Sequence, residues 1–119
     1  MSKVMIVDDT EFLRLRITRM LTEDGFNTVE AEDGQIAVNV YKNEHPDLVL
    51  MDLSMPNMDG LTALRKIKEH DPQALVIMLT ALGQESTVLE AIQSGAKDYI
   101  VKPFQKERVL SAINKLLCN

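Results

Sequence analysis

The stretch LVLMDLSMP, residues 48–56, places a carboxylate directly after four consecutive apolar residues. A short, uninterrupted apolar run is typical of a parallel strand that is buried on both faces of its sheet. The run stops at Asp52, and Pro56 cannot donate a hydrogen bond to a central strand. We therefore interpret Leu48–Met51 as a buried strand that leads at once into a charged residue and a loop.

On either side of this stretch, strand-like runs alternate with segments whose apolar residues recur at helical spacing, as Leu13, Ile17 and Leu21 do. Five such units, with no linker or repeat between them, predict one α/β domain over residues 1–119. We expect a doubly wound, five-stranded parallel sheet with helices on both faces. The predicted strands are Val4–Val7, Thr28–Ala31, Leu48–Met51, Leu75–Leu79 and Tyr99–Val101.

The composition restricts the possible partners. The apolar runs are too short for a membrane span or a signal peptide, so we expect no contact with a membrane. The net charge of −5 argues against nucleic-acid binding, which usually requires a basic face. The single cysteine, Cys118, cannot form an internal disulfide, which fits a reducing cytoplasm. We therefore expect a cytoplasmic monomer whose partners are proteins or cations.

Polar residues with useful chemistry follow four of the five predicted strands. In chain order they are Asp8 and Asp9, Asp52, Thr80, which precedes Ala81, and Lys102. Open α/β sheets place their ligand sites beyond the carboxyl ends of the strands, so these side chains should converge on one edge.

This set of residues suggests a metal-dependent phosphoryl site. Crowded carboxylates repel one another unless a cation lies among them, and Mg²⁺ prefers such oxygen ligands. A metal beside Asp52 would allow this carboxylate to act as a nucleophile toward a phosphoryl group, with Lys102 pairing the transferred oxygens. From the residues alone, simpler explanations remain open: Asp8 and Asp9 as helix-capping residues, and Asp52 as a turn former.

Four motifs together resemble the receiver domain of two-component response regulators, over the whole chain. They are Asp8-Asp9 after MIV, Asp52 in LVLMDLSMPNMDG, Thr80-Ala81 after LVIML, and Lys102-Pro103 in GAKDYIVKPF. The resemblance implies a flavodoxin-like fold with strand order 2-1-3-4-5. The stretch GAKDYIVKPFQ, with no output domain attached, is most similar to single-domain chemotaxis-type (CheY-like) regulators.

The resemblance also implies a role for each site residue. Asp52 becomes the phosphoacceptor, Tyr99 the aromatic residue that turns inward on activation, and the Lys102-Pro103 bond a cis peptide. The expected Mg²⁺ ligands are Asp8, Asp9, Asp52 and the Ser54 carbonyl. The expected contacts of the phosphoryl group are Ser54, Thr80, Ala81 and Lys102.

The implied function is a phosphorylation-activated switch rather than an enzyme. It would accept a phosphoryl group from a histidine kinase or a histidine phosphotransfer domain and change its affinity for a protein target, in chemotaxis or flagellar control. One alternative is a receiver from a transcriptional or other multidomain regulator. Another is an aspartyl-phosphate phosphatase of the haloacid dehalogenase type, although those proteins resemble D-x-D-x-T and position 54 here is Ser.

Two surfaces are expected to carry the contacts with partners. The first helix should expose Leu15 among arginines, and with Phe104-Gln105 it resembles the surface that meets the phosphodonor. The face around Gln93, Lys97 and Lys106 is the candidate output surface.

Overall fold

Strands and helices alternate along the whole described part of the chain, residues 2–117, in the computed structural model. The strands are β1 (Lys3–Val7), β2 (Asn27–Ala31), β3 (Leu48–Asp52), β4 (Val76–Thr80) and β5 (Asp98–Val101). The helices are α1 (Glu11–Glu23), α2 (Gly34–Glu44), α3 (Gly60–His70), α4 (Glu85–Gln93) and α5 (Lys106–Leu117). Cys118 lies outside the described residues.

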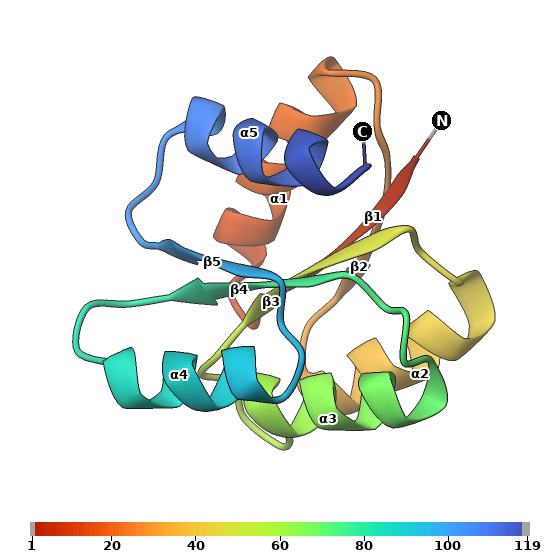
Figure 1. Cartoon of the computed structure of the whole chain (residues 1–119). Helices are drawn as coiled ribbons and strands as arrows, with labels where there is room; N and C mark the ends of the chain where they lie inside the picture. The colour runs from red at the N-terminus through yellow and green to blue at the C-terminus, as the bar shows by residue number, and fades with distance from the viewer. Residues whose placement is uncertain (1, 118–119) are drawn as a thin grey trace.

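The five strands form one parallel sheet in the order β2-β1-β3-β4-β5, so the predicted flavodoxin-like fold is confirmed. Figure 1 shows α1 and α5 on one face of the sheet and α2, α3 and α4 on the other. Because β3 lies at the centre of the sheet, every one of its residues is buried. The strand that bears Asp52 thus forms the middle of the core.

Successive residues of the inner strands point to opposite faces of the sheet, and a helical layer covers each face. Val49 and Met51 pack in the core on the side of α2 and α3, whereas Leu48 and Leu50 pack on the side of α1 and α5. A strand that is covered on both faces is apolar along the part that the two helical layers cover, which explains the uninterrupted run at Leu48–Met51.

The strand ends differ by one residue from the predicted ones at several places. Asp52 is the last residue of β3, where it pairs with Leu79, and Thr80 is the last residue of β4. Pairing between neighbouring backbones therefore continues past the apolar run into the first polar residue. At the other end, β4 begins at Val76 rather than Leu75.

Among residues 2–117, no helix has both the length and the apolar character needed to cross a membrane.

Candidate functional site

Three carboxylates lie together where β1 and β3 end. Asp8 and Asp9 directly follow β1, and its neighbour in the sheet, β3, ends at Asp52. One carboxylate oxygen from each residue lies within 4.8 Å of the other two. Asp8 and Asp52 are buried, with exposed fractions of 1% and 6%, whereas Asp9 is exposed. The predicted acidic cluster is therefore formed.

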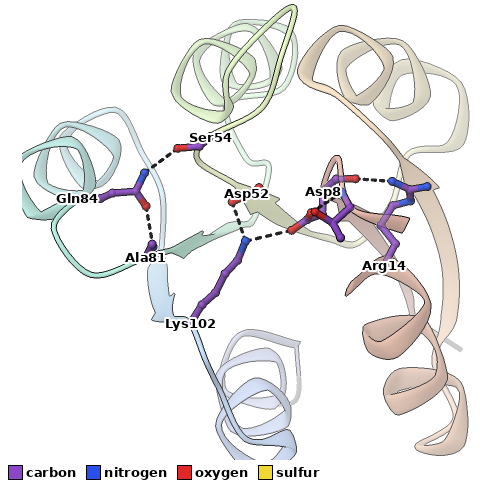
Figure 2. Close-up of polar contacts among 8 residues, drawn as sticks. Asp8, Arg14, Asp52, Ser54, Ala81, Gln84 and Lys102 are labelled. Carbon is purple, nitrogen blue, oxygen red and sulfur yellow. Dashed lines mark hydrogen bonds and ion pairs between the residues drawn. The ribbon is translucent and has the colours of Figure 1, made fainter. Parts of the chain in front are cut away.

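Lys102 lies beside this cluster, from the segment that follows β5. Its Nζ donates to Asp52 Oδ1 at 3.0 Å and to Asp8 Oδ2 at 3.2 Å (Figure 2). Its backbone N–H donates to the Thr80 carbonyl at 2.7 Å, and the following bond to Pro103 is cis, as predicted. One lysine thus faces three carboxylates, and the cluster keeps an excess of negative charge.

The pKa values of Asp52 and Lys102 reflect this balance of charges. Burial raises the pKa of Asp52; Lys102 opposes the rise, and the charges of Asp8 and Asp9 add to it. For Lys102, burial alone would lower the pKa, but Asp52 and Asp8 outweigh that effect and the pKa is raised. Both shifts are those expected where negative charge is concentrated in a partly desolvated place.

Oxygen ligands, close carboxylates and excess negative charge together fit a hard divalent cation such as Mg²⁺. Asp8, Asp9 and Asp52 are the residues whose side chains would hold it.

Local contacts fix the position of Asp8. Its Oδ1 accepts the Thr10 backbone N–H at 2.8 Å, and Arg14 Nη1 donates to its backbone carbonyl at 2.6 Å. Arg14 is in turn held by Glu30, with Nε 3.1 Å from Oε1. Asp8 therefore belongs to the cluster and also satisfies a backbone donor at the start of α1. Arg14 thus supports the site, a role that its place in the sequence did not predict.

The opposite side of the site is formed by the loops after β3 and β4. The Thr80 hydroxyl donates to the Ala81 carbonyl at 3.1 Å, and the Ala81 N–H donates to Gln84 Oε1 at 2.6 Å. Gln84 Nε2 donates to Ser54 Oγ at 2.7 Å, so one carboxamide joins the two loops (Figure 2). No role for Gln84 could be predicted, because nothing in its spacing along the sequence distinguishes it from a solvated loop residue.

Tyr99 lies away from the carboxylates, at the side of the sheet. Its side chain is 44% exposed and borders an open groove of about 270 Å³, which is also lined by Thr80 and by the exposed Leu82 and Leu89. Thr80 therefore lies between the acidic cluster and this groove, which places the two expected switch residues on a common cavity.

The fold and the site together define a class: α/β proteins whose parallel sheet presents acidic residues, a threonine and a lysine at its carboxyl edge. The chain belongs to the response regulator receiver domain family, whose model matches residues 4–114.

Named relatives agree with this assignment. The chain is 57% identical to a chemotaxis protein CheY of Bacillus subtilis over 116 residues, 97% of each chain. It is 46% identical to a CheY of Thermotoga maritima, covering 96% of each. Among solved structures, a CheX-CheY-BeF3-Mg+2 complex from Borrelia burgdorferi matches with a TM-score of 0.93 and 41% identity, covering 99% of this chain and 90% of that one.

The protein is accordingly a phosphorylation-activated switch of the two-component type, homologous to chemotaxis regulators. Its family is one of signalling domains, so the phosphatase of the haloacid dehalogenase type is not supported.

Proposed function

We propose that Asp52 accepts a phosphoryl group from the phosphohistidine of a kinase or of a histidine phosphotransfer domain. The observation that carries the proposal is the contact of Lys102 Nζ with Asp52 Oδ1 at 3.0 Å, inside a cluster of three carboxylates. A carboxylate at the end of the central strand, with a cation ready to pair with incoming oxygens, has the surroundings that a phosphoryl acceptor needs.

The proposed metal is Mg²⁺, held by the side chains of Asp8, Asp9 and Asp52 and by the Ser54 carbonyl. When bound, it supplies positive charge that reduces the repulsion between a carboxylate and an incoming phosphoryl group. The similar structure from Borrelia burgdorferi is a CheX-CheY-BeF3-Mg+2 complex, which supports the choice of metal.

In the transfer step, an Asp52 carboxylate oxygen forms a bond to phosphorus as the bond from phosphorus to the histidine nitrogen breaks. The electron pair of that bond stays on the imidazole nitrogen. Lys102 pairs the transferred oxygens, and the Thr80 hydroxyl, which now donates to the Ala81 carbonyl, rotates toward them. Tyr99 then turns into the groove that it borders with Thr80.

Two surfaces would serve the partners. Leu15 is 53% exposed on α1, as predicted, and lies in a shallow depression with Phe12, Arg16 and Arg19 that would meet the phosphodonor. Phe104 is buried in the core, so its ring cannot contribute to that surface.

The output surface would comprise α4, β5 and α5 around Gln93, Lys97 and Lys106, next to the Tyr99 groove. The target would be a protein of the chemotaxis or flagellar apparatus, which is supported by the complex of the similar Borrelia CheY with CheX. We propose that this receiver domain acts in the cytoplasm as a monomer and that its partners are proteins rather than nucleic acids.

The test is to mix the protein with Mg²⁺ and acetyl phosphate and to measure its intact mass. We expect an adduct of one phosphoryl group that is labile to base, absent without Mg²⁺ and absent in Asp52→Asn. An adduct that persists in Asp52→Asn would show that another residue is the acceptor. Steady release of phosphate from unrelated esters would instead favour a phosphatase.

A further inference from the structure

The Gln84 side chain points in a direction that a role in capping α4 does not explain. It immediately precedes α4, yet its side chain makes no capping bond to the first turn of that helix. The half-buried side chain instead extends across the edge of the sheet toward the loop after β3. Figure 2 shows its carboxamide between Ala81 and Ser54, on the side of the site opposite Asp8.

Both ends of this carboxamide are engaged by short hydrogen bonds. Oε1 accepts the Ala81 N–H at 2.6 Å, and Nε2 donates to Ser54 Oγ at 2.7 Å. Ser54 and Gln84 are 30 residues apart in the chain, so the contact joins two separate loops. Two anchors restrict the carboxamide to one orientation, because the side-chain oxygen and nitrogen have different hydrogen-bonding capacity.

The bond to Ala81 matters because a backbone amide has a single hydrogen to donate. In the proposed function, this N–H is one of the donors that bind the phosphoryl oxygens. While Gln84 Oε1 accepts it, a phosphoryl oxygen cannot. The adjacent Thr80 hydroxyl is also engaged within the protein, on the Ala81 carbonyl. Both donors at the end of β4 are therefore occupied in this structure.

We propose that Gln84 is a latch: its carboxamide competes with the phosphoryl group for the Ala81 N–H and thereby sets how tightly that group is held. The inference rests on the proposed function of Asp52. Gln84 is a positioning residue, since it acts through Ala81 and Ser54 and not on the reacting atoms. When the phosphoryl group takes the Ala81 N–H, the start of α4 loses one of its two ties to the site.

The loss of that tie gives the latch a consequence beyond the site. Leu82, two residues before Gln84, and Glu85, directly after it, line the same groove as Tyr99. Release of the carboxamide therefore frees the segment that forms one wall of the groove. A phosphoryl group on Asp52 would therefore alter the proposed output surface through this segment as well as through Thr80.

The test compares Gln84→Met with the wild type in the binding of beryllofluoride, a mimic of the phosphoryl group, in the presence of Mg²⁺. Methionine keeps the length of the side chain and removes both hydrogen bonds. In the variant, water can accept the Ala81 N–H in place of the carboxamide, so the change in affinity reflects only the net strength of that hydrogen bond. We therefore expect the apparent Kd for beryllofluoride to fall about threefold to tenfold. Gln73→Met, at an exposed position between α3 and β4, is the matched control and should bind like the wild type.

A second readout needs no phosphoryl mimic and reports directly on the hydrogen bond from the Ala81 N–H to Gln84. The Ala81 amide of the unliganded protein, followed by NMR, should lose protection from hydrogen exchange in Gln84→Met and keep it in Gln73→Met. Gln84→Glu retains an acceptor oxygen, so its Ala81 amide should remain protected. This variant keeps the test usable if Gln84→Met fails to fold, and loss of protection in Gln84→Glu would overturn the latch.

The outcomes separate the latch from the function on which it rests. If the wild type binds beryllofluoride and Gln84→Met binds it equally or more weakly, the latch is refuted and the proposed function stands. If the wild type binds no beryllofluoride and takes no phosphoryl group at Asp52, the proposed function fails and the latch fails with it. Tighter binding together with an unprotected Ala81 amide supports the latch.

Discussion

Two buried carboxylates share one lysine nitrogen, with Lys102 Nζ 3.0 Å from Asp52 and 3.2 Å from Asp8. Removing one partner of a buried charge pair costs more than the pair itself contributes, because the remaining charge is desolvated without compensation. Lys102 is 27% exposed, so water reduces this cost without abolishing it.

We therefore predict that Lys102→Met destabilises the protein when EDTA removes divalent cations, by about 1–3 kcal/mol in urea unfolding. Added Mg²⁺ should restore part of this loss, because it brings positive charge to the same carboxylates. Lys106→Met, which removes a long and exposed pair with Glu23, is the control and should change stability by less than about 1 kcal/mol. A Lys102→Met protein as stable as the wild type in EDTA would contradict this account of the pair.

Site residues differ in how far the sequence reveals them. Asp8, Asp52 and Lys102 could be predicted because they follow or end strands, and the backbone alone brings strand ends together. Arg14 and Gln84 could not be predicted, because their contacts depend on how long side chains from a helix and a loop cross the edge of the sheet. Such contacts leave no periodic signal.

At the scale of the elements, α2 is tied to the loop that carries Ser54. Asp33, its N-cap, accepts the Ile36 N–H at 2.9 Å and the Asn57 side-chain amide at 3.0 Å. The Gly34 N–H donates to the Met58 carbonyl at 3.1 Å, and a Cβ at Gly34 would overlap that carbonyl oxygen. One carboxylate therefore caps a helix and holds the loop after β3.

Because of this double role, we predict that Asp33 makes the stability of the protein depend on pH. The Ile36 backbone N–H and the Asn57 amide lower the pKa of Asp33 below its ordinary value, so the folded state binds its proton more weakly than the unfolded state. The resulting stability is complete above the unfolded pKa of about 3.9 and is lost as the pH falls through the lower folded value.

Asp33→Asn keeps a capping side chain without the charge, so the stability advantage of the wild type should shrink as the pH falls below about 4. Urea unfolding of both proteins from neutral to acidic pH measures this difference, and the other carboxylates cancel in the comparison. A difference that stays constant across the whole range would mean that the charge of Asp33 contributes nothing.

Strands β4 and β5 carry the proposed switch, because Thr80 and Tyr99 border the same groove. We predict that Thr80→Ala still accepts a phosphoryl group at Asp52 but loses most of the change at Tyr99 that phosphorylation causes in the wild type. The reason is that alanine has no hydroxyl to move toward the new oxygens and vacate space.

Fluorotyrosine NMR can report this change, since the only other tyrosine, Tyr41, is buried and donates to Asp71. Thr28→Ala, on the far edge strand β2, is the control and should behave like the wild type. If the Tyr99 signal of Thr80→Ala responds to phosphorylation as fully as that of the wild type, the change at Tyr99 does not depend on the Thr80 hydroxyl.

At the scale of the whole molecule, periodicity predicted five βα units but could not order the strands. The order 2-1-3-4-5 came from the resemblance to receivers, because Val, Ile and Leu in β1, β3 and β4 are equally apolar and do not identify their neighbours. The strand ends were misjudged by a residue for a related reason. Backbone pairing extends to Asp52 and Thr80, and hydrogen bonds between strands are invisible to a hydrophobic pattern.

The acidic cluster should also make the stability of the whole fold depend on Mg²⁺. Asp8, Asp9 and Asp52 come together only when β1 and β3 pair, so the unfolded chain has no comparable site. A ligand that binds only the native state stabilises it according to its concentration, by ~2.7 kcal/mol at 100 times its Kd. Thermal unfolding should therefore move to higher temperature as Mg²⁺ is added.

Asp9→Asn tests whether the cluster is the cause. The variant removes one negative charge from the group, so its metal-free form should be more stable than the metal-free wild type, because the charge of Asp9 is among those that disfavour ionised Asp52. Its response to Mg²⁺ should be smaller, because an oxygen ligand has lost its charge. Glu69→Gln, an exposed acid on α3, should leave both quantities unchanged. If the wild type unfolds at the same temperature with and without Mg²⁺, these three carboxylates do not form a metal site, and the repulsion among them must be relieved by Lys102 alone.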